Sequence, residues 1–378
     1  MHGCTRLREA TLEHQFNRRQ FLVGAAGVAI LGMTGSLFAC SPDNKDEVTS
    51  GNATDDSSNS SNSNDKASVN TEPITFVFLP DSSSADLTES RNAVAEAIKN
   101  ACGRDAKIMT TTDYNVTIEA IASGSAGMGL FGAEGYVQAN RKNNKVQSAF
   151  TASDENGTLD GACYYSRICV RTEDVDEYRD GSGFTLEPLR GKSFSFVSAT
   201  STSGFKVPGA KLVSEFDLSG SEVLLERGAF FSEILFGNSH QGSVVNLMSG
   251  DVDAAAFDDV DVDMYLEIVS GEANMPGSVY KVRDDAGDPF TSVRGKQFTI
   301  ISVTPVLNAP FVFNEDKVTA TERDAIVRYF CSSAVSNDKR IFSDPDDKDA
   351  KALNVKRSEK MCYLPVADSW YDPIRLLS

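Results

Sequence analysis

An alternation of apolar runs and amphipathic segments, beginning at residue 74, constrains the fold of this chain most strongly. The first run, ITFVFL, ends in a proline followed by serines, as a buried strand does where it enters a loop. Residues 86–103 then place apolar side chains at helical spacing and stop at Gly103. Further strand-like and helix-like segments follow in turn up to residue 142. Strands that alternate with helices predict a parallel sheet with helices on both faces.

The alternation breaks and restarts in the middle of the chain. Residues 172–191 are mostly polar and indicate a boundary, after which strand-like and helix-like segments resume. The apolar run of residues 297–314 has the pattern of a strand by which the chain returns. We therefore predict an α/β protein of two lobes, with a ligand cleft between them at the carboxyl ends of the strands. The predicted boundaries are 73–175 with 298–378 for the first lobe, and 176–297 for the second.

The N-terminal residues carry the features of an export signal. Arg18 and Arg19 precede an apolar run, interrupted by glycines, that ends in Leu-Phe-Ala before Cys40. Paired arginines are typical of the twin-arginine route, and the ending resembles the lipobox of bacterial lipoproteins. We predict that residues 1–39 are a signal peptide and that Cys40 is lipidated; the alternative is a plain signal peptide with an incidental cysteine. Residues 40–72 are too polar to enter a core and are predicted to form a disordered tether.

Charge and cysteine content exclude several classes of function. The formal net charge of -18 argues against nucleic acid or an anionic membrane surface as the partner of the folded body. It allows a small anionic ligand, because backbone dipoles can build such a site. Beyond Cys40 five cysteines remain, with no Cys-x-x-Cys pair, so neither a zinc site nor any other metal or cofactor is predicted. Cys331 and Cys362 are the pair that we would expect to form a disulfide.

Small hydroxyl residues and a glycine stand where a strand of the second alternation meets a helix. After the apolar run SFSFV come Ser201, Thr202, Ser203 and Gly204, and Pro208 falls close to the first helical turn. The first N–H groups of a helix lack backbone partners and carry partial positive charge, so they bind anions. Hydroxyl groups add donors, and glycine lets the backbone approach closely. The segment is therefore predicted to hold a tetrahedral oxyanion; the alternative is an ordinary serine or threonine helix cap.

His240 is the next candidate for the same site. It is the one histidine that remains after the predicted signal peptide, and it lies in the turn Gly-Asn-Ser-His just before a helical pattern. A ring nitrogen at this place would donate a hydrogen bond to an oxyanion. The alternative is an incidental or capping histidine.

Six short motifs follow one another from about residue 74 to the end of the chain. They are Y-x-x-x-I-E-A-I-x-x-G at 114–124, G-A-E-G-Y-V-Q-A at 132–139, S-T-S-G-x-x-x-P at 201–208, F-G-N-S-H at 236–240, G-D-V-D-A-A-A at 250–256 and Y-D-P-I-R at 371–375. The set resembles the solute-binding proteins of ABC transporters for phosphonate, phosphite and phosphate. The resemblance implies a two-lobed type II periplasmic-binding-protein fold, with sheets of mainly parallel strands flanked by helices. It also implies a monomeric receptor, not an enzyme, that delivers a phosphorus oxyanion to membrane permease and ATPase subunits.

The resemblance assigns roles to individual residues. The predicted ligand-binding set is Ser201, Thr202 and Ser203 as donors to the oxyanion, His240 as a further donor, Tyr114 and Tyr165 as aromatic lining, and Asp258 and Ser82. Tyr164 is the alternative to Tyr165, and Tyr165 would otherwise be a strand residue that faces the core. Asp258 would accept a hydrogen bond from a P–OH group or pair with an amine, unless it is merely a solvated strand end.

One departure from the family pattern narrows the ligand. Members that bind aminoalkyl phosphonates place a carboxylate just before a proline in the return strand, whereas this chain has Asn308-Ala309-Pro310. An aminoalkyl ligand is therefore in doubt, and phosphite, phosphate or a small alkylphosphonate stays open.

Three other classes of function compete with a transport receptor. A hydrolase would need a nucleophile beside a base, and the sequence contains no G-x-S-x-G. A calcium loop at Asp259, Asp261 and Asp263 lacks the glycine and the closing glutamate that such loops require. A lipoprotein that senses the same ligand for a membrane signalling partner would carry the same sequence features as a transport receptor.

Overall fold

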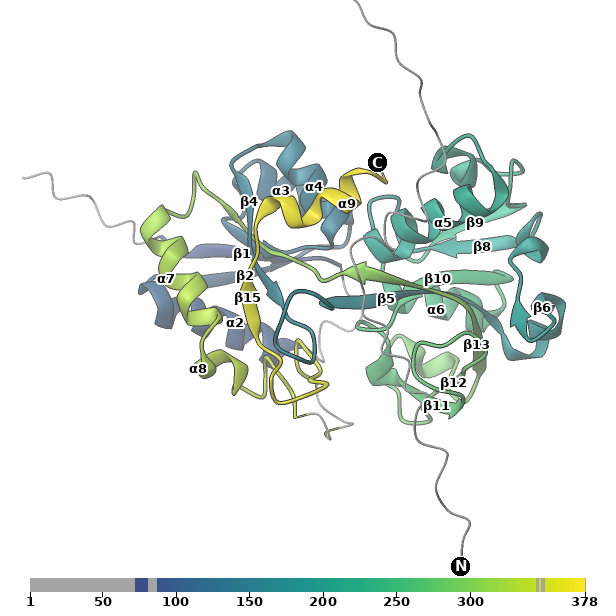
Figure 1. The fold of residues 1–378 in the computed structure, drawn as a ribbon. Helices are drawn as coiled ribbons and strands as arrows, with labels where there is room; N and C mark the ends of the chain where they lie inside the picture. The colour runs from purple at the N-terminus through teal and green to yellow at the C-terminus, as the bar shows by residue number, and fades with distance from the viewer. Residues whose placement is uncertain (1–71, 81–86, 345–346, 348–350, 378) are drawn as a thin grey trace, which may run out of the picture.

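The computed structural model describes residues 72–80, 87–344, 347 and 351–377, which form two lobes, each built around one large β-sheet (Figure 1). Three sequence-based predictions fall outside the described residues. These are the signal peptide of residues 1–39, the lipidated Cys40 with the tether up to residue 71, and the ligand contact of Ser82. They stay predictions.

The first lobe, residues 74–152 and 311–377, is built on a six-stranded mixed sheet. The strand order is β15 (Tyr363–Pro365), β4 (Val146–Ala152), β14 (Phe311–Asn314), β3 (Met128–Leu130), β1 (Ile74–Phe78) and β2 (Ala106–Thr110). β1 pairs in parallel with β2 and β3, as the alternation of strands and helices predicts. β14 is antiparallel to β3 and β4, and β15 is antiparallel to β4, so the predicted parallel arrangement holds only for the first three strands.

Helices cover both faces of the first sheet (Figure 1). α2 (Thr88–Cys102), α7 (Ala320–Phe330) and α8 (Ser333–Ser336) pack on one face, and α3 (Tyr114–Ala122), α4 (Ala133–Lys142) and α9 (Asp372–Arg375) pack on the other. Phe76 faces the first group and Val77 the second, because successive side chains of a strand point to opposite sides. Both residues are fully buried, which explains why this strand reads as a continuous apolar run.

The second lobe, residues 163–307, is built on a seven-stranded mixed sheet. The order is β11 (Leu266–Ser270), β12 (Val279–Val282), β13 (Gln297–Leu307), β5 (Cys163–Arg171), β10 (Ala254–Asp258), β8 (Ser193–Phe196) and β9 (Glu233–Phe236). β8 is parallel to β9 and β10, whereas β5 is antiparallel to β10 and β13. α5 (Val207–Phe216) packs on one face of the sheet and α6 (His240–Ser249) on the other.

Short elements complete the two lobes. They are the hairpin of β6 (Arg179–Asp180) and β7 (Gly183–Phe184), the π-helix η3 (Thr202–Lys206) and the 3-10 helices η1 (Thr172–Tyr178), η2 (Glu187–Leu189), η4 (Ser221–Leu225), η5 (Asp263–Tyr265), η6 (Phe290–Ser292) and η7 (Asp368–Tyr371).

The two sheets divide the chain at positions other than the predicted lobe boundaries. β5 and β13, which the prediction assigns to the first lobe, are neighbours in the second sheet, and the chain crosses between sheets at residues 153–162 and 308–310. The polar residues 172–191, which the sequence indicates as a boundary, form short elements within the second lobe. The predicted return strand is two strands, β13 and β14, because the chain crosses from the second sheet to the first at residues 308–310.

The cysteines of the described chain are free thiols, so the predicted disulfide between Cys331 and Cys362 is wrong. Burial, with the neighbouring Cys362, raises the pKa of the Cys331 thiol to about 12. Such a thiol stays protonated at neutral pH and is a poor nucleophile, which disfavours its oxidation. No helix of the described residues is long and apolar enough to cross a membrane.

Candidate functional site

The hydroxyl segment opens a helix, as its sequence predicts. Ser201 is extended and its side chain accepts a hydrogen bond of 3.1 Å from the N–H of Gly204, which caps the π-helix η3; α5 follows directly, with Pro208 in its first turn. Glycine is required at position 204, because a Cβ atom there would lie 2.3 Å from the side chain of Val197. Ser201, Thr202 and Ser203 are all buried. Their hydroxyl groups therefore lie in a low-dielectric environment, where a hydrogen bond to an anion is strong.

Thr202 brings the hydroxyl segment into contact with the first lobe. Its Oγ1 atom accepts a hydrogen bond of 2.8 Å from the N–H of Glu134, in the first turn of α4. Gly132 comes so close that a Cβ atom on it would lie 2.8 Å from the same oxygen. Two helix N-termini, one from each lobe, thus meet at Thr202. The Glu134 N–H is not among the predicted donors, although the motif G-A-E-G-Y after a glycine-rich strand marks a helix start.

Ser203 connects the segment with the strands of the second lobe. Its hydroxyl group donates to Asp258 Oδ2 at 3.1 Å and accepts from the hydroxyl group of Tyr164 at 3.2 Å. Its carbonyl oxygen accepts from the hydroxyl group of Ser166 at 2.6 Å. Tyr164 and Ser166 lie on β5, and Asp258 ends β10. The carboxyl end of β10 therefore meets the beginning of η3, where the sequence predicts the site.

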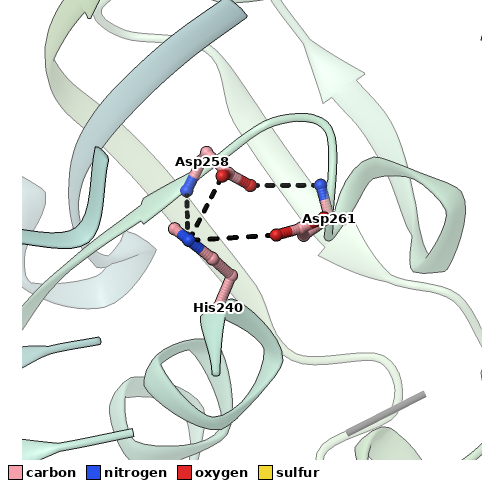
Figure 2. Close-up of side chains that lie close together, drawn as sticks. All are labelled: His240, Asp258 and Asp261. Carbon is pink, nitrogen blue, oxygen red and sulfur yellow. Dashed lines mark hydrogen bonds and ion pairs between the residues drawn. The ribbon is translucent and has the colours of Figure 1, made fainter. Parts of the chain in front are cut away.

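His240 is the first residue of α6 and faces the same carboxylate (Figure 2). Its Nδ1 atom accepts a hydrogen bond of 3.0 Å from the N–H of Asp258. Its Nε2 atom lies 3.2 Å from Asp258 Oδ2 and 3.8 Å from Asp261 Oδ2. Since Nδ1 accepts, the neutral ring carries its proton on Nε2, which is then a donor directed toward these oxygens. His240 is thus close to Ser203 through Asp258, as predicted.

Asp258 has the most perturbed environment of these residues. It is 2 % exposed, so the interpretation as a solvated strand end is wrong. Burial first, and the adjacent Asp259 second, raise the pKa of Asp258 to about 8, although hydrogen bonds from the Asp261 N–H and from Ser203 act in the opposite direction. Desolvation and a like charge both disfavour the ionised carboxylate. At neutral pH the group is therefore largely a neutral acid that can both donate and accept a hydrogen bond.

His240, Asp258 and Asp261 are also the one group in the described part of the chain whose ligand atoms lie close enough together to hold a metal ion. A metal on Nε2 would have to replace the proton that this nitrogen carries while Nδ1 accepts from a backbone N–H. The arrangement is explained without an ion, as a hydrogen-bonded imidazole and carboxyl pair.

The predicted aromatic residues lie at different places. Tyr114 is 4 % exposed and is the first residue of α3, whose start is capped by the side chain of Asp113. Burial raises the pKa of Tyr164 well above its usual range, and the nearby Asp258 and Tyr114 add to the shift. Tyr114 thus lies near Tyr164, and it is the hydroxyl group of Tyr164 that contacts Ser203. Tyr165 points to the other face of β5, where its ring lies beneath the guanidinium of Arg357 at 5.7 Å.

Two α/β lobes that meet where a buried hydroxyl segment faces a helix N-terminus define the class of two-lobed substrate-binding proteins. The chain belongs to the family of periplasmic substrate-binding proteins of phosphonate ABC transporters, because residues 76–371 match the model of that family. Its members are substrate-binding transport proteins, which are not enzymes, and they act outside the cytoplasm.

One curated protein is similar in sequence, and two solved structures are similar in fold. The chain is 30% identical over 189 residues to the phosphate-import protein PhnD of Mycolicibacterium smegmatis, an alignment that spans 50% of this chain and 56% of that protein. The fold is similar to that of PhnD1 from Prochlorococcus marinus in complex with methylphosphonate, with a TM-score of 0.58, 14% identity and coverage of 82% and 97% of the two chains. It is also similar to a binding protein component of an ABC phosphonate transporter from Pseudomonas aeruginosa, with a TM-score of 0.58, 16% identity and coverage of 81% and 85%.

Proposed function

We propose that this chain is the solute-binding component of an ABC importer and captures a phosphorus oxyanion between its two lobes. Phosphite, phosphate and small alkylphosphonates are the candidate ligands. A curated relative is a phosphate-import protein, and a structural neighbour was solved with methylphosphonate. Both names support a tetrahedral phosphorus anion as the ligand class.

The observation that carries this proposal is the meeting of donors from both lobes at Thr202 and Ser203. The N–H of Glu134 comes from the first lobe, whereas the two hydroxyl groups and His240 Nε2 come from the second. The Thr202 hydroxyl accepts from the Glu134 N–H and can still donate its proton to an oxyanion. The Ser203 hydroxyl donates to Asp258 in this structure and would have to rotate away from that carboxyl group to donate to an oxyanion. A ligand held by both lobes favours their closed arrangement.

Asp258 supports a ligand that carries a proton at neutral pH. The carboxyl group can share a proton with a P–OH group, either by donating its own or by accepting that of the ligand. Sulfate carries no such proton at neutral pH and would lie against Asp258 as a like charge once the carboxylate ionises. This difference favours phosphorus oxyanions over sulfate.

Asn308 argues against an aminoalkyl ligand. Its side-chain amide donates to the carbonyl oxygen of Ala152 at 2.9 Å, and its own carbonyl oxygen accepts from the hydroxyl group of Tyr371 at 3.1 Å. The residue that takes the place of the family's carboxylate therefore belongs to the crossing between the lobes. It offers no negative charge to an ammonium group.

The predicted surroundings of the protein follow from its N-terminal sequence. Lipidation of Cys40 would hold the monomeric receptor at the outer face of the cell membrane, and residues 41–72 would give it reach. Its partners would be the permease and ATPase subunits of the importer. This placement fits the extracytoplasmic family to which the chain belongs.

Alanine substitution of the hydroxyl residues tests the proposed site. S203A and T202A should each weaken binding of methylphosphonate or phosphate by about 1–3 kcal/mol, because each removes a buried hydrogen bond to an anion. Titration calorimetry measures the affinity. S125A is the matched control, since Ser125 is exposed in the first lobe and should leave affinity unchanged. Unchanged affinity in both site variants would remove this segment from the binding site.

A further inference from the structure

We infer that Arg357 locks the two lobes together by pairing with Asp259, and so sets ligand affinity without touching the ligand. The inference rests on the proposed function, because it concerns the closure that follows ligand capture. It assigns a role to a segment, residues 351–361, that none of the six sequence motifs includes.

Arg357 belongs to the first lobe. Its N–H lies 2.9 Å from the sulfur of Met361, and the segment continues directly into β15 of the first sheet. Ser358 anchors the same segment, because its hydroxyl group donates to the carbonyl oxygen of Glu155 near the first crossing. The guanidinium of Arg357 nevertheless reaches the second lobe, with Nη2 3.4 Å from Asp259 Oδ2.

Asp259 is held in place to receive this cation. The residue is 3 % exposed, and its Oδ1 accepts from the N–H of Tyr165 at 2.8 Å. Its Oδ2 accepts from the side-chain amide of Asn274 at 2.9 Å. Asn274 is in turn fixed by the Nε atom of the buried Arg167 at 2.7 Å. Because these hydrogen bonds already orient the Asp259 carboxylate, its side chain loses little conformational entropy when it pairs with Arg357.

The face of Tyr165 adds a second contact for the same guanidinium, at 5.7 Å from the ring centroid. Cation–π attraction of this kind adds to the ion pair. Tyr165, predicted to line the ligand site, is thus placed where it would recognise the other lobe.

In a second ion pair between the lobes, the second lobe supplies the cation and the first lobe the anion. Lys206 of η3, in the second lobe, lies 4.0 Å from Glu134 of α4, in the first lobe, and both side chains are mostly buried. The pair adjoins the hydrogen bond of Thr202 to the Glu134 N–H. Each lobe therefore offers one cation and one anion to the other, so the closed arrangement is specified by charge at two separate places.

A contact that exists only when the lobes are together stabilises the closed state. The apparent affinity of the ligand rises with the fraction of protein in that state. Loss of Arg357 should therefore act on ligand release, although the residue touches none of the candidate donors. Since the Arg357 side chain is 43% exposed, solvent screens part of the attraction and the effect is moderate.

The amide of Glu134 reports lobe separation without any ligand. Glu134 is the second residue of α4, and its N–H donates to Thr202 of the other lobe at 2.8 Å. Its protection from hydrogen exchange depends on Thr202 of the other lobe. Exchange at this amide therefore measures how often the lobes part.

The test compares R357Q with R340Q in the purified full-length chain. Arg340 is a matched control, because it pairs with Asp338 and Glu96 inside the first lobe. We expect R357Q to bind methylphosphonate or phosphate about threefold to tenfold more weakly, through faster dissociation, and to exchange Glu134 faster by a similar factor. R340Q should match the parent within about twofold, and R357K, which keeps the charge, should retain part of the affinity.

A double-mutant cycle with D259N separates the pair from a general effect on folding. R357Q should cost little further affinity in the D259N background if the two residues act through each other. The inference would be overturned if R357Q and R340Q lost affinity equally. It would also be overturned if R357Q lowered affinity as much in the D259N background as in the parent protein. If the parent protein binds neither methylphosphonate nor phosphate, the proposed function fails. Unchanged hydrogen exchange at the Glu134 amide in R357Q would overturn the role of the Arg357–Asp259 pair, whatever the result for ligand binding.

Discussion

A single carboxyl group, that of Asp258, shows how far the surroundings of one residue can change its chemistry. Its position after an apolar strand predicts a strand end, yet its pKa lies near 8, because it is buried and stands beside Asp259. The same group contacts Ser203, His240 and the Asp261 N–H. It is therefore the residue whose protonation links the hydroxyl segment to the start of α6.

This pKa predicts a pH dependence of stability. The folded-state pKa of Asp258 lies above the unfolded value, so the folded protein binds more protons than the unfolded chain between about pH 4 and about pH 8. Its contribution to the free energy of unfolding is complete below about pH 4 and is lost as pH rises through this window. D258N, which cannot ionise, should lose less stability over the same range. Urea unfolding of both proteins at several pH values measures the free energy of unfolding. If this free energy changes with pH in the same way in both proteins, the raised pKa of Asp258 is contradicted.

Residue-scale prediction from sequence succeeds where the chemistry is local. The cap by Ser201, which is the alternative interpretation of the hydroxyl segment, and the helix start at His240 both follow from neighbours in the chain. The choice between Tyr164 and Tyr165 does not, because strand periodicity places them on opposite faces without saying which face meets the hydroxyl segment. The contact of Arg357 with Asp259 joins residues about a hundred positions apart, and no local pattern marks it.

At the scale of elements, helices are easier to predict than strand pairing. α2 stops at Gly103, which adopts the left-handed conformation with φ of 79°, and α7 begins with a capping box between Thr319 and Glu322. Both ends are set by residues within one turn. The direction in which β5 and β13 pair depends on segments far apart in the chain, so the alternation predicted parallel sheets where the structure has mixed ones.

The C-terminal motif Y-D-P-I-R acts through an element, not through the ligand. Tyr371 is fully buried and stacks edge-on against Tyr136 of α4, with ring centroids 5.4 Å apart. Arg375 and the hydroxyl group of Tyr136 both contact Asp368. These contacts fasten α4, whose first turn presents the Glu134 N–H to Thr202. The motif is thus explained as a support for the helix that reaches the other lobe.

At the scale of the whole molecule, function depends on how closely the two lobes meet. If Gly132 of the first lobe were alanine, the three atoms nearest to its Cβ would all belong to Thr202 of the second lobe, the first of them at 2.8 Å. G132A should therefore spare the fold, since its φ of -63° suits alanine, but keep the lobes apart. We expect ligand affinity to fall about tenfold or more. Calorimetry measures the ligand affinity, and circular dichroism checks that the fold is retained. Unchanged affinity in G132A would show that the lobes need not meet at Thr202.

The central claim, capture of a phosphorus oxyanion, is tested most directly by thermal unfolding of the full-length chain with one compound at a time. The compounds are phosphite, phosphate, methylphosphonate, 2-aminoethylphosphonate and sulfate. A ligand that binds only the folded state raises the unfolding midpoint, in proportion to the logarithm of its concentration once the site is saturated. We predict a rise with phosphite, phosphate or methylphosphonate and none with sulfate. If no phosphorus compound raises the unfolding midpoint, or if sulfate raises it equally, the capture of a phosphorus oxyanion is contradicted.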